Sequence, residues 1–490
     1  MLRRNPLIYE INTWVWLNEL SAQEGERITL ANVPQAVIDA LVAWRVDVIW
    51  MMGVWTRSAA GRQVALTHPD LQAEYRHALP DFGEEDVVGS PYAVRRYAVD
   101  PALGGAQGLA AFRAQLAQHG LKLFLDYVPN HVAIDHHWTD DGPGALVQGT
   151  LSDLERDPGT YFSVENGRVF GHGRDPSYPA WSDTAQVDAF SEDARQQSRA
   201  TLLDIATQCD GVRCDMAMLL VNRIFARTWK RSIEPPQEFW SAVIPAVRAA
   251  YPEFTFMGEV YWNMEAEMLS LGFDYTYDKR LYDRMRDGDA GAIRDHIAAG
   301  LGYQQHMVRF TENHDEARAL TAFQTVEKAC AANALTVLLP GASLLYEGQF
   351  EGRRVKLPVQ LGRRRVEPIE PRVLEFARKL LAEATADIYH TGTYLALAIA
   401  PRHEHDATNN FLLAFVWTHA ADWRIVALNY SEQPAQGRIM LPNPAWNGAQ
   451  ARTFLDILTG DAVQVPGDDL LTGGLAIELA PYQVRIYHIE

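Results

Sequence analysis

Cysteine is scarce in this chain of 490 residues, which contains only Cys209, Cys214 and Cys330. Three scattered cysteines are too few for a disulfide framework, and their spacing does not match a zinc-binding motif. Long apolar runs are also missing from the sequence. No window approaches the length of a membrane span, and the first residues lead into a strand-like run without the apolar segment of a signal peptide. We therefore expect a cytoplasmic protein without a membrane partner.

Positive charge is in deficit. The chain has 44 Lys and Arg against 62 Asp and Glu, which gives a formal net charge of -18 at pH 7. This charge argues against nucleic acid or an anionic membrane surface as the main partner, whereas a neutral substrate would be unaffected by it. At this length and with 48% apolar residues, we expect a large globular domain with a smaller companion.

The chain repeats one arrangement, in which an apolar run ends in polar residues. Parallel strands of a (β/α)8 barrel deliver such residues to the carboxyl-terminal rim, where barrels carry their chemistry. The pattern therefore predicts acids and imidazoles gathered at one rim. The runs lie within residues 121–131, 211–215, 254–259 and 307–315 and end, in that order, in Asn130 and His131, Asp215, Glu259, and Asn313, His314 and Asp315.

Eight strand signals alternate with helical segments, which favours an α/β fold with a (β/α)8 TIM barrel over a sandwich. A long loop after the second strand is expected to carry Tyr92 and Tyr97. Helices are predicted at residues 33–44, 107–118 and 371–388, among others. The predicted strands are residues 7–16, 46–52, a run from residue 121, and residues 211–215, 254–259, 273–277, 307–311 and 342–346.

The predicted barrel comprises residues 1–131 and 191–390. Residues 132–190 interrupt it after the third strand; they are rich in Gly, Pro, Asp and aromatics, so we expect an inserted, loop-rich small domain over the active site. Ser191 is expected to cap the helix that follows. Short apolar runs separated by turn residues predict a C-terminal antiparallel β-sandwich domain at residues 391–490.

Arg213 and Asp215 are predicted to share one face of a strand, because successive side chains of a strand alternate between its two faces. An arginine two residues before an aspartate holds that carboxylate ionised and oriented, as a nucleophile requires. A buried ion pair with a purely structural role is the alternative.

Four motifs, found in this order, resemble those of the α-amylase family of glycoside hydrolases. They are Asp126-Tyr-Val-Pro-Asn-His131, Gly211-Val-Arg-Cys-Asp215, Gly258-Glu259-Val and Glu312-Asn-His-Asp315. The resemblance runs from the first strand to the C-terminal β domain. It implies a retaining glycoside hydrolase that cleaves α-glucosidic bonds in oligosaccharides or α-glucans.

The resemblance also implies a role for each motif residue. Asp215 matches the nucleophile that forms a covalent glycosyl intermediate, Glu259 the general acid/base, and Asp315 the carboxylate that stabilises the transition state. Arg213 matches the residue that orients the nucleophile. The residues implied to bind the sugar beside the cleaved bond are His131, His314 and the aromatic platform Tyr92. Alternatively, His131 and His314 are structural histidines of the core whose hydrogen bonds are made within the protein.

The chemistry agrees with these roles. A retaining glycosidase needs two carboxylates about 5 Å apart, one ionised and one protonated. Glu259 follows an apolar run without an adjacent basic residue, so we expect burial to keep it protonated and to set the upper limb of a bell-shaped pH profile. Trp262, Tyr261 and Trp181 are candidates for stacking on sugars, with plain packing as the alternative.

The sequence departs from the family pattern at two places. Residues 216–219 replace the Lys-His pair that follows the nucleophile in typical endo-acting amylases, and Ala93 stands where many α-glucosidases have an acid. Both departures leave the substrate length open. No cofactor is expected to be required; Asn130 is either structural or a calcium ligand, as in many members of the family.

A basic segment follows the eighth strand. The alternatives are a solvated basic surface paired with carboxylates and an anion site for phosphate, a sugar phosphate or an acidic acceptor, because barrels often bind phosphate beside their last loops. Its arginines are Arg353, Arg354, Arg363, Arg364 and Arg365, with Lys356 among them.

Competing functions stay open at this point. A transglycosylase or phosphorylase of the same family would pass the glycosyl group from Asp215 to a sugar or to phosphate. A catalytically inactive carbohydrate-binding protein would retain only the barrel, although the intact set of catalytic residues argues against it. A metal-dependent barrel hydrolase would need ligand pairs near strand ends that the sequence does not contain.

Overall fold

The computed structural model of the chain describes residues 2–442 and 450–489. Met1, residues 443–449 and Glu490, which belong to the predicted domains 1–131 and 391–490, lie outside the described residues. Within the described ranges, none of the helices combines the length and apolar character needed to cross a bilayer.

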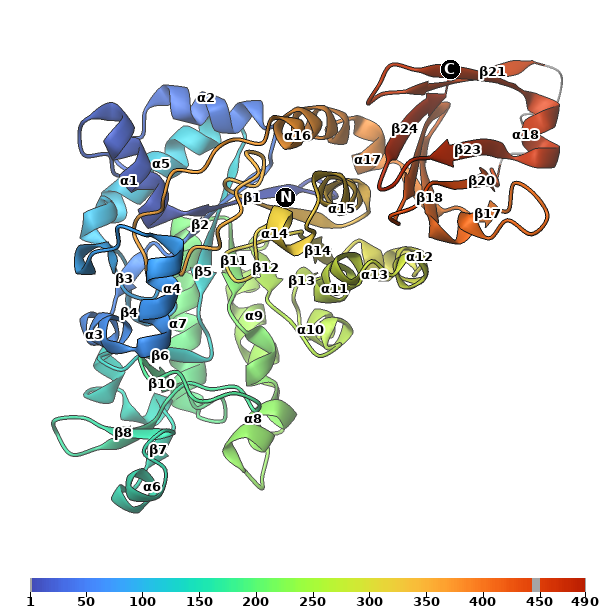
Figure 1. Ribbon diagram of the computed structural model, residues 1–490. Helices are drawn as coiled ribbons and strands as arrows, with labels where there is room; N and C mark the ends of the chain where they lie inside the picture. The colour runs from blue at the N-terminus through green and yellow to red at the C-terminus, as the bar shows by residue number, and fades with distance from the viewer. Residues whose placement is uncertain (1, 443–449, 490) are drawn as a thin grey trace. The chain divides into compact units, whose positions relative to one another are not determined.

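Eight strands form a closed barrel in the order β1-β15-β14-β13-β12-β11-β5-β2, which confirms the predicted TIM barrel (Figure 1). The strands are almost wholly buried, as expected of parallel strands covered on both faces, and this burial explains their continuous apolar runs. They are β1 (Leu7–Asn12), β2 (Val48–Met52), β5 (Lys122–Tyr127), β11 (Gly211–Cys214), β12 (Thr255–Gly258), β13 (Tyr275–Tyr277), β14 (Met307–Arg309) and β15 (Ala342–Tyr346).

The chain divides into two compact units, which we describe separately. The first contains residues 9–277 and 356–366, and the second contains residues 2–8, 278–355 and the chain from residue 367 onward. The domain borders drawn from the sequence remain predictions.

The first unit corrects two sequence predictions. Residues 13–16, predicted to continue the first strand, begin helix α1, because Asn12 caps that helix by accepting a hydrogen bond from the Val15 N–H. The predicted long loop after the second strand contains two helices and the paired strands β3 (Trp55–Arg57) and β4 (Val94–Val99), and Tyr97 lies on β4. Ser191 caps α7 as predicted.

The helices of the first unit, other than the one in the insertion, follow the order of the chain. They are α1 (Thr13–Glu24), α2 (Gln35–Ala43), α3 (Ala59–Thr67), α4 (Pro69–Ala78), α5 (Gly105–Gln118), α7 (Glu192–Gln208), α8 (Asn222–Trp229), α9 (Phe239–Ala250) and α10 (Glu265–Ser270).

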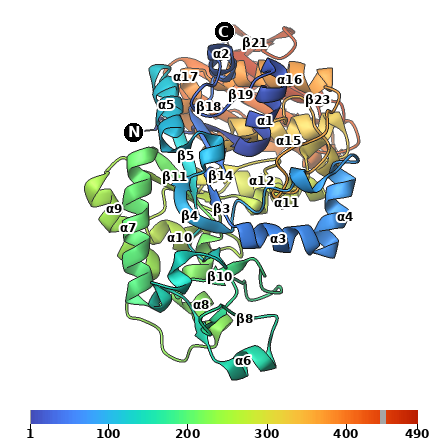
Figure 2. The ribbon, with the colours of Figure 1, turned by 90° about the vertical axis from the view of Figure 1, so that its left-hand side faces the viewer.

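The predicted insertion has a small hydrophobic core of its own. This core includes Trp138, Leu146, Phe170 and Val187. Figures 1 and 2 both draw β8 (Tyr161–Ser163), β10 (Thr184–Gln186) and α6 (Leu151–Arg156) at the same end of the first unit as α8. The insertion contains β6 (His131–Ala133), β7 (Gln148–Gly149), α6 (Leu151–Arg156), β8 (Tyr161–Ser163), β9 (Val169–Gly171) and β10 (Thr184–Gln186), with β6 and β10 antiparallel.

The second unit holds β14, β15 and two C-terminal sheets. The larger sheet contains β16 (Thr393–Ala396), β18 (Leu412–His419), β19 (Asp422–Asn429), β24 (Val484–Ile489), β21 (Ala451–Asp456) and β22 (Ala462–Pro466). The smaller contains β17 (Ile399–Ala400), β20 (Ala435–Ile439) and β23 (Leu475–Leu479). Neighbouring strands in both sheets are antiparallel, as predicted. The two sheets share one hydrophobic core, which includes Val416 of the larger sheet and Ile477 of the smaller.

The predicted helix at residues 371–388 is divided between α16 and α17 in the structure. The helices of the second unit are α11 (Lys279–Asp287), α12 (Ala290–Ile297), α13 (Leu301–Gln304), α14 (Ala319–Ala322), α15 (Val326–Leu338), α16 (Pro371–Ala384), α17 (Asp387–Thr391) and α18 (Gly467–Gly473).

Candidate active site

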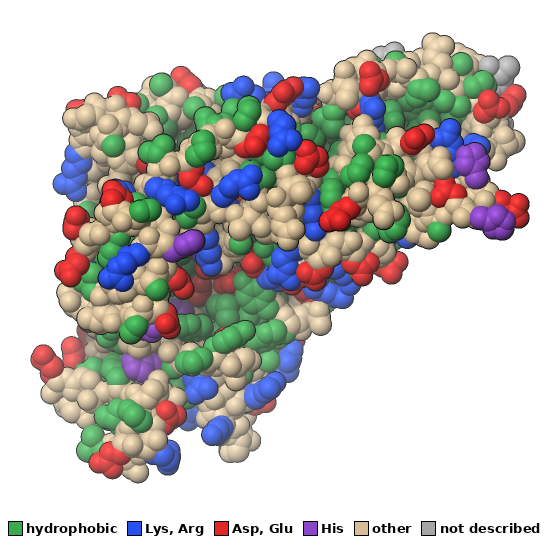
Figure 3. Space-filling view, in the orientation of Figure 1, with side chains coloured by type: hydrophobic (Ala, Val, Ile, Leu, Met, Phe, Trp, Pro, Cys, Tyr) green, Lys and Arg blue, Asp and Glu red, His purple; other side chains and the backbone are tan. Residues whose placement is uncertain are grey.

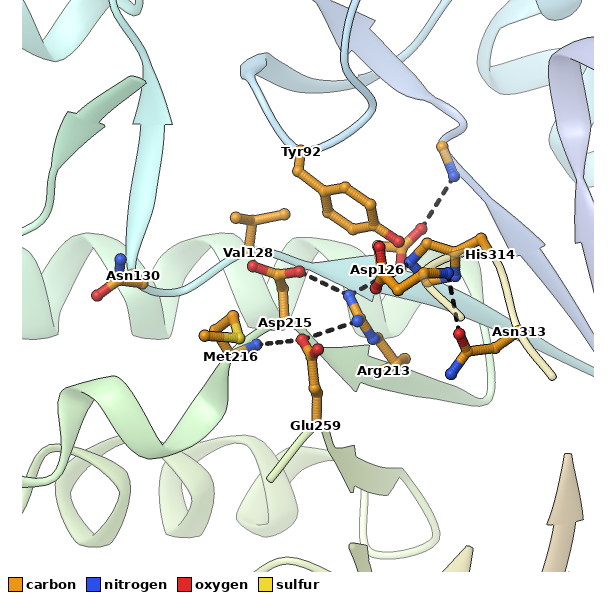
Figure 4. Close-up of polar contacts among 12 residues, drawn as sticks. Tyr92, Asp126, Val128, Asn130, Arg213, Asp215, Met216, Glu259, Asn313 and His314 are labelled. Carbon is orange, nitrogen blue, oxygen red and sulfur yellow. Dashed lines mark hydrogen bonds and ion pairs between the residues drawn. The ribbon is translucent and has the colours of Figure 1, made fainter. Parts of the chain in front are cut away.

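Arg213 lies at the centre of the predicted site in the first unit. It is fully buried on β11, where the register places it opposite Asp126 of β5 and Met257 of β12. Its Nη1 donates to Oδ1 of Asp215 at 2.7 Å, and its Nη2 donates to Oε2 of Glu259 at 2.8 Å (Figure 4). One guanidinium therefore holds both predicted catalytic carboxylates.

The barrel backbone fixes the positions of these two acids. The Asp215 N–H donates to the carbonyl of Tyr127 at 2.8 Å, which extends the pairing of β11 with β5. The Glu259 N–H donates to the carbonyl of Cys214 at 3.0 Å, which extends the pairing of β12 with β11. Both carboxylates thus follow the carboxyl ends of adjacent strands, and their side chains are 8% and 4% exposed.

The Glu259 carboxylate accepts hydrogen bonds from three donors, two of which are distant from it in the sequence or belong to the backbone. Oε2 accepts from the Met216 N–H at 2.7 Å as well as from Arg213, and Oε1 accepts from the Tyr261 hydroxyl at 2.6 Å. Glu259 therefore has a basic partner in space, Arg213, although no basic residue adjoins it in the chain. Met216 has φ 42°, a left-handed conformation that is uncommon for a residue with a side chain.

Aromatic rings surround the Arg213 guanidinium. Its carbon lies 5.2 Å from the ring centroid of Tyr92, 5.5 Å from that of Trp50 and 5.9 Å from that of Tyr277. Burial alone lowers the pKa of Arg213, but the negative charge of Glu259, followed by smaller contributions that include Asp215, raises it well above its ordinary value. Arg213 is therefore permanently charged, and the Tyr92 ring lies beside it; the role of Tyr92 as a platform for the sugar stays a prediction.

Asp126 also belongs to this cluster, and the sequence analysis did not select it. It is 1% exposed, its Oδ1 lies 4.0 Å from Arg213 Nη1, and its Oδ2 accepts from the Gly53 N–H at 2.9 Å. The signal was present, because Asp126 is the first residue of the motif that ends in His131. Its place opposite Arg213 became evident only from the strand register.

His131 is buried beside Tyr92 and Trp181. Burial lowers the pKa of His131 to about 3, and a hydrogen bond to the Tyr92 backbone opposes this shift. The ring centroid of Trp181 lies 5.0 Å from that of His131. The sequence allowed Trp181 either to stack on a sugar or to pack within the protein. A neutral imidazole at this place can exchange hydrogen bonds with an uncharged ligand.

Trp262 projects from the loop that follows Glu259. The side chain is 44% exposed, and both Trp262 and Asn263 have φ 61°, so two consecutive residues adopt the left-handed conformation. Such a conformation carries strain for residues with side chains, and strained residues cluster at binding sites. Trp262 therefore remains a candidate for stacking on a ligand.

The last motif lies in the second unit. His314 is 1% exposed in its side chain, and its Nε2 lies 2.8 Å from Oδ2 of Asp315, whose side chain is 46% exposed. Asn313 shapes the turn by accepting the N–H groups of Asp315 and Glu316 at 2.9 Å each. Asp315 is thus held in the loop that follows β14, with an accessible carboxylate.

Two arginines of the basic segment in the first unit contact carboxylates. Arg363 bonds Asp86 at 2.7 Å and Asp81 at 3.0 Å, and Arg364 pairs with Glu19. In the second unit, the backbone N–H of Arg354 donates to Glu367. On the face drawn in Figure 3, Lys and Arg side chains lie beside Asp and Glu side chains. These pairs are those expected of a basic surface matched by acids, and the anion site remains a prediction.

The surroundings of Asn130 do not suit a calcium ion. Its Oδ1 accepts a hydrogen bond of 3.0 Å from the amide nitrogen of Gln186, so a nitrogen donor stands where a calcium ion would need further oxygens. Among the described residues, no group of three or more His, Cys, Asp and Glu is arranged to hold a metal ion.

The sequence is similar to those of known carbohydrate-active proteins. No family model matches the chain. It is 27% identical over 333 residues to the α-amylase MalA of Haloarcula japonica, covering 64% of this chain and 43% of that protein. It is 27% identical over 202 residues to an α-1,4-glucan:maltose-1-phosphate maltosyltransferase of Burkholderia pseudomallei, covering 39% of this chain and 15% of that protein. The chain thus spans less than half the length of either relative.

Among solved structures, an α-amylase from Lactobacillus plantarum superimposes with a TM-score of 0.69 at 18% identity, covering 99% of both chains. This likeness extends the shared fold through the barrel to the C-terminal sheets. Together, the four ordered motifs, the closed barrel and the sequence similarity to MalA make the chain similar to the α-amylase family of glycoside hydrolases.

Proposed function

We propose that the protein is a retaining glycoside hydrolase that cleaves α-glucosidic bonds in oligosaccharides or α-glucans. The observation that carries this proposal is the pair of hydrogen bonds from Arg213 to Asp215 and to Glu259. Because adjacent nitrogens of one guanidinium hold them, the two carboxylates lie within a few ångströms of each other. Such proximity supports a retaining mechanism, in which the two carboxylates are about 5 Å apart, rather than an inverting one, which needs a wider spacing.

In this mechanism Asp215 attacks the anomeric carbon and forms a covalent glycosyl intermediate. Arg213 keeps Asp215 ionised and oriented, since its charge lies 2.7 Å from Oδ1. Glu259 protonates the leaving oxygen and then, as a base, activates the water that releases the sugar. The hydrogen bonds to both oxygens of Glu259 fix the direction in which it faces.

We propose that the remaining motif residues bind the reacting sugar. Asp315 would stabilise the transition state, as the family resemblance assigns, and His314 supports its carboxylate at 2.8 Å. The neutral ring of His131 and the aromatic face of Tyr92 suit the hydroxyl groups and apolar face of an uncharged sugar.

Two variants and the stereochemistry of the product test the proposal. Wild-type protein should release the α-anomer from maltooligosaccharides, followed by NMR before mutarotation. Asp215→Asn and Glu259→Gln should each lose at least about 1,000-fold in kcat/KM with an unactivated substrate. An initial β-anomer, or Asp215→Asn protein with normal turnover, would contradict the mechanism.

Transfer of the glycosyl group to another acceptor is a second candidate. The similarity to a maltosyltransferase that is named for a sugar phosphate supports it. Water and acceptor compete for the same intermediate on Asp215, so the catalytic residues are common to both reactions. Product analysis with maltooligosaccharides, with and without phosphate or excess acceptor sugar, separates them: hydrolysis yields only shorter sugars, and transfer yields longer sugars or sugar phosphates.

We also propose a cytoplasmic location. The three cysteines support it, because all three are unpaired and buried, as is common in a reducing compartment. Fractionation of the source cells with an antibody to the protein tests the proposal, and recovery from the culture medium would contradict it.

A further inference from the structure

Three carbonyl oxygens converge on the amide nitrogen of Gln186. Nε2 donates to the Asn130 backbone oxygen at 2.7 Å, to Asn130 Oδ1 at 3.0 Å and to the Val187 backbone oxygen at 3.0 Å. Gln186 is fully buried and Asn130 is 1% exposed, so water does not screen these contacts. We call Asn130 O, Asn130 Oδ1 and Val187 O the carbonyl cluster.

The orientation of the Gln186 amide is determined by its partners. Oε1 accepts from the Arg174 N–H at 3.2 Å, on the side away from the carbonyl cluster. The reversed amide would place its oxygen against three carbonyl oxygens and its NH2 group against an N–H donor, which is unfavourable on both sides. The nitrogen must therefore face the carbonyl cluster.

A buried cluster of carbonyl oxygens is an environment that hard cations favour. Backbone and asparagine carbonyl oxygens are common calcium ligands, and a buried group of them is costly without a positive partner. Here that partner is the NH2 group of Gln186, whose two hydrogens are shared among three acceptors. We infer that the Gln186 amide takes the place of a bound cation, so that the protein needs no calcium at this position.

The amide also joins two separate parts of the first unit. Asn130 follows barrel strand β5, whereas Gln186 ends β10 of the insertion. The Val187 N–H adds a hydrogen bond of 3.0 Å to the Asn130 backbone oxygen, and β10 pairs Gln186 with His131. The contact thus holds the insertion against the segment that carries His131. A cation bound to the same oxygens would also hold these two segments together. Loss of the amide should therefore lower the stability of the protein, and a cation bound in its place should restore it.

Exchange of this one nitrogen for oxygen tests the inference. Gln186→Glu keeps the shape of the side chain but turns a carboxylate toward the carbonyl cluster, which creates an oxygen site for calcium. Thermal unfolding is measured in EGTA and in millimolar CaCl2 for wild type, Gln186→Glu and the control Gln148→Glu. Gln148 lies in the same insertion and is exposed, and its amide donates to one carbonyl, that of Pro143.

The expected results differ for the three proteins. Wild type and Gln148→Glu should have the same Tm in both media to within about 1 °C, because neither has a cation site here. Gln186→Glu should lose roughly 5 °C or more in EGTA and recover most of it in calcium. A wild-type Tm that falls on chelation would overturn the inference. A Gln186→Glu protein that stays unfolded or indifferent in calcium would overturn it too.

Discussion

The hydroxyl of Tyr261 donates a hydrogen bond of 2.6 Å to Oε1 of Glu259. Tyr261 lies two residues beyond Glu259, in the same segment, and contacts the oxygen that neither Arg213 nor Met216 holds. It acts through Glu259 and is therefore a positioning residue.

Loss of this hydroxyl should lower the catalytic rate more than substrate affinity. Tyr261→Phe removes the donor that orients Oε1 of Glu259, so kcat with a maltooligosaccharide should fall by roughly 10-fold while KM changes little. Steady-state kinetics of wild type and Tyr261→Phe measure both constants. Tyr178→Phe, at an exposed tyrosine of the insertion, is the control and should leave both unchanged. A normal kcat in Tyr261→Phe would remove Tyr261 from the positioning of Glu259.

The Tyr261 contact also illustrates the limits of the sequence. Barrel strands and the two acids were predictable, because parallel buried strands are continuous apolar runs and each acid follows one of them. Contacts that depend on register were not predictable. Arg213 reaches Glu259, and Asp126 lies opposite Arg213, only because β11 pairs with both β5 and β12.

Other errors came from local capping and from short elements. Residues 13–16 are apolar and aromatic enough to suggest a strand, yet the Asn12 side chain accepts the Val15 N–H and starts a helix there. Strands of three residues, such as β3, are too short for a periodicity to be recognised. Neither signal was strong in the sequence alone.

Arg213→Lys should be severely impaired, although it keeps the charge. A lysine has one compact ammonium group and cannot donate to Asp215 and Glu259 from two fixed nitrogens. We expect kcat/KM to fall at least about 100-fold, as when a preorganised donor is lost from other active sites. The matched control is Arg223→Lys, at an exposed ion pair with Glu267, which should stay within about twofold. Near-normal activity of Arg213→Lys would show that charge alone suffices.

Acid should destabilise the protein through His131. The unfolded chain binds a proton near the ordinary histidine pKa of about 6.5, whereas burial lowers the pKa of folded His131 to about 3. Between these values only the unfolded state is protonated, so the free energy of unfolding falls as the pH falls, by up to about 1.4 kcal/mol per pH unit from this residue. Burial lowers the pKa of His136 to about 3 as well, so its contribution has the same sign.

Urea unfolding at several pH values from 7 down to about 4 measures this dependence. His131→Gln should flatten the slope of the unfolding free energy against pH, because one of the buried histidines with a lowered pKa is gone, while His136 and His172 remain. His77→Gln, at an exposed histidine, should leave the slope as in wild type. A slope unaffected by His131→Gln would contradict the low pKa of the buried ring.

The basic segment offers a comparison between neighbouring arginines. The Arg364 side chain is 8% exposed and pairs with Glu19, whereas Arg365 is exposed. Arg364→Gln should lower the free energy of unfolding by about 1–3 kcal/mol, while Arg365→Gln should change it by less than about 0.5 kcal/mol. Catalytic rates should not respond to added sulfate if the segment serves stability. Sulfate inhibition that disappears in either variant would favour an anion site instead.

Variants of Trp262 can distinguish stacking on a ligand from packing within the protein, because the residue is 44% exposed. Replacement by alanine removes a side chain that is only partly buried, so Tm should fall by no more than a few degrees. Loss of a sugar-stacking ring should in addition raise KM for maltooligosaccharides by roughly 5- to 50-fold. A small aryl glucoside, which occupies only the site beside Asp215 and Glu259, should show a smaller change. The experiment therefore compares both substrates in Trp262→Ala, with Trp262→Phe as the variant expected to retain most binding. Equal KM values for the long substrate in wild type and Trp262→Ala would assign this tryptophan to packing alone, and its left-handed backbone would then need another explanation.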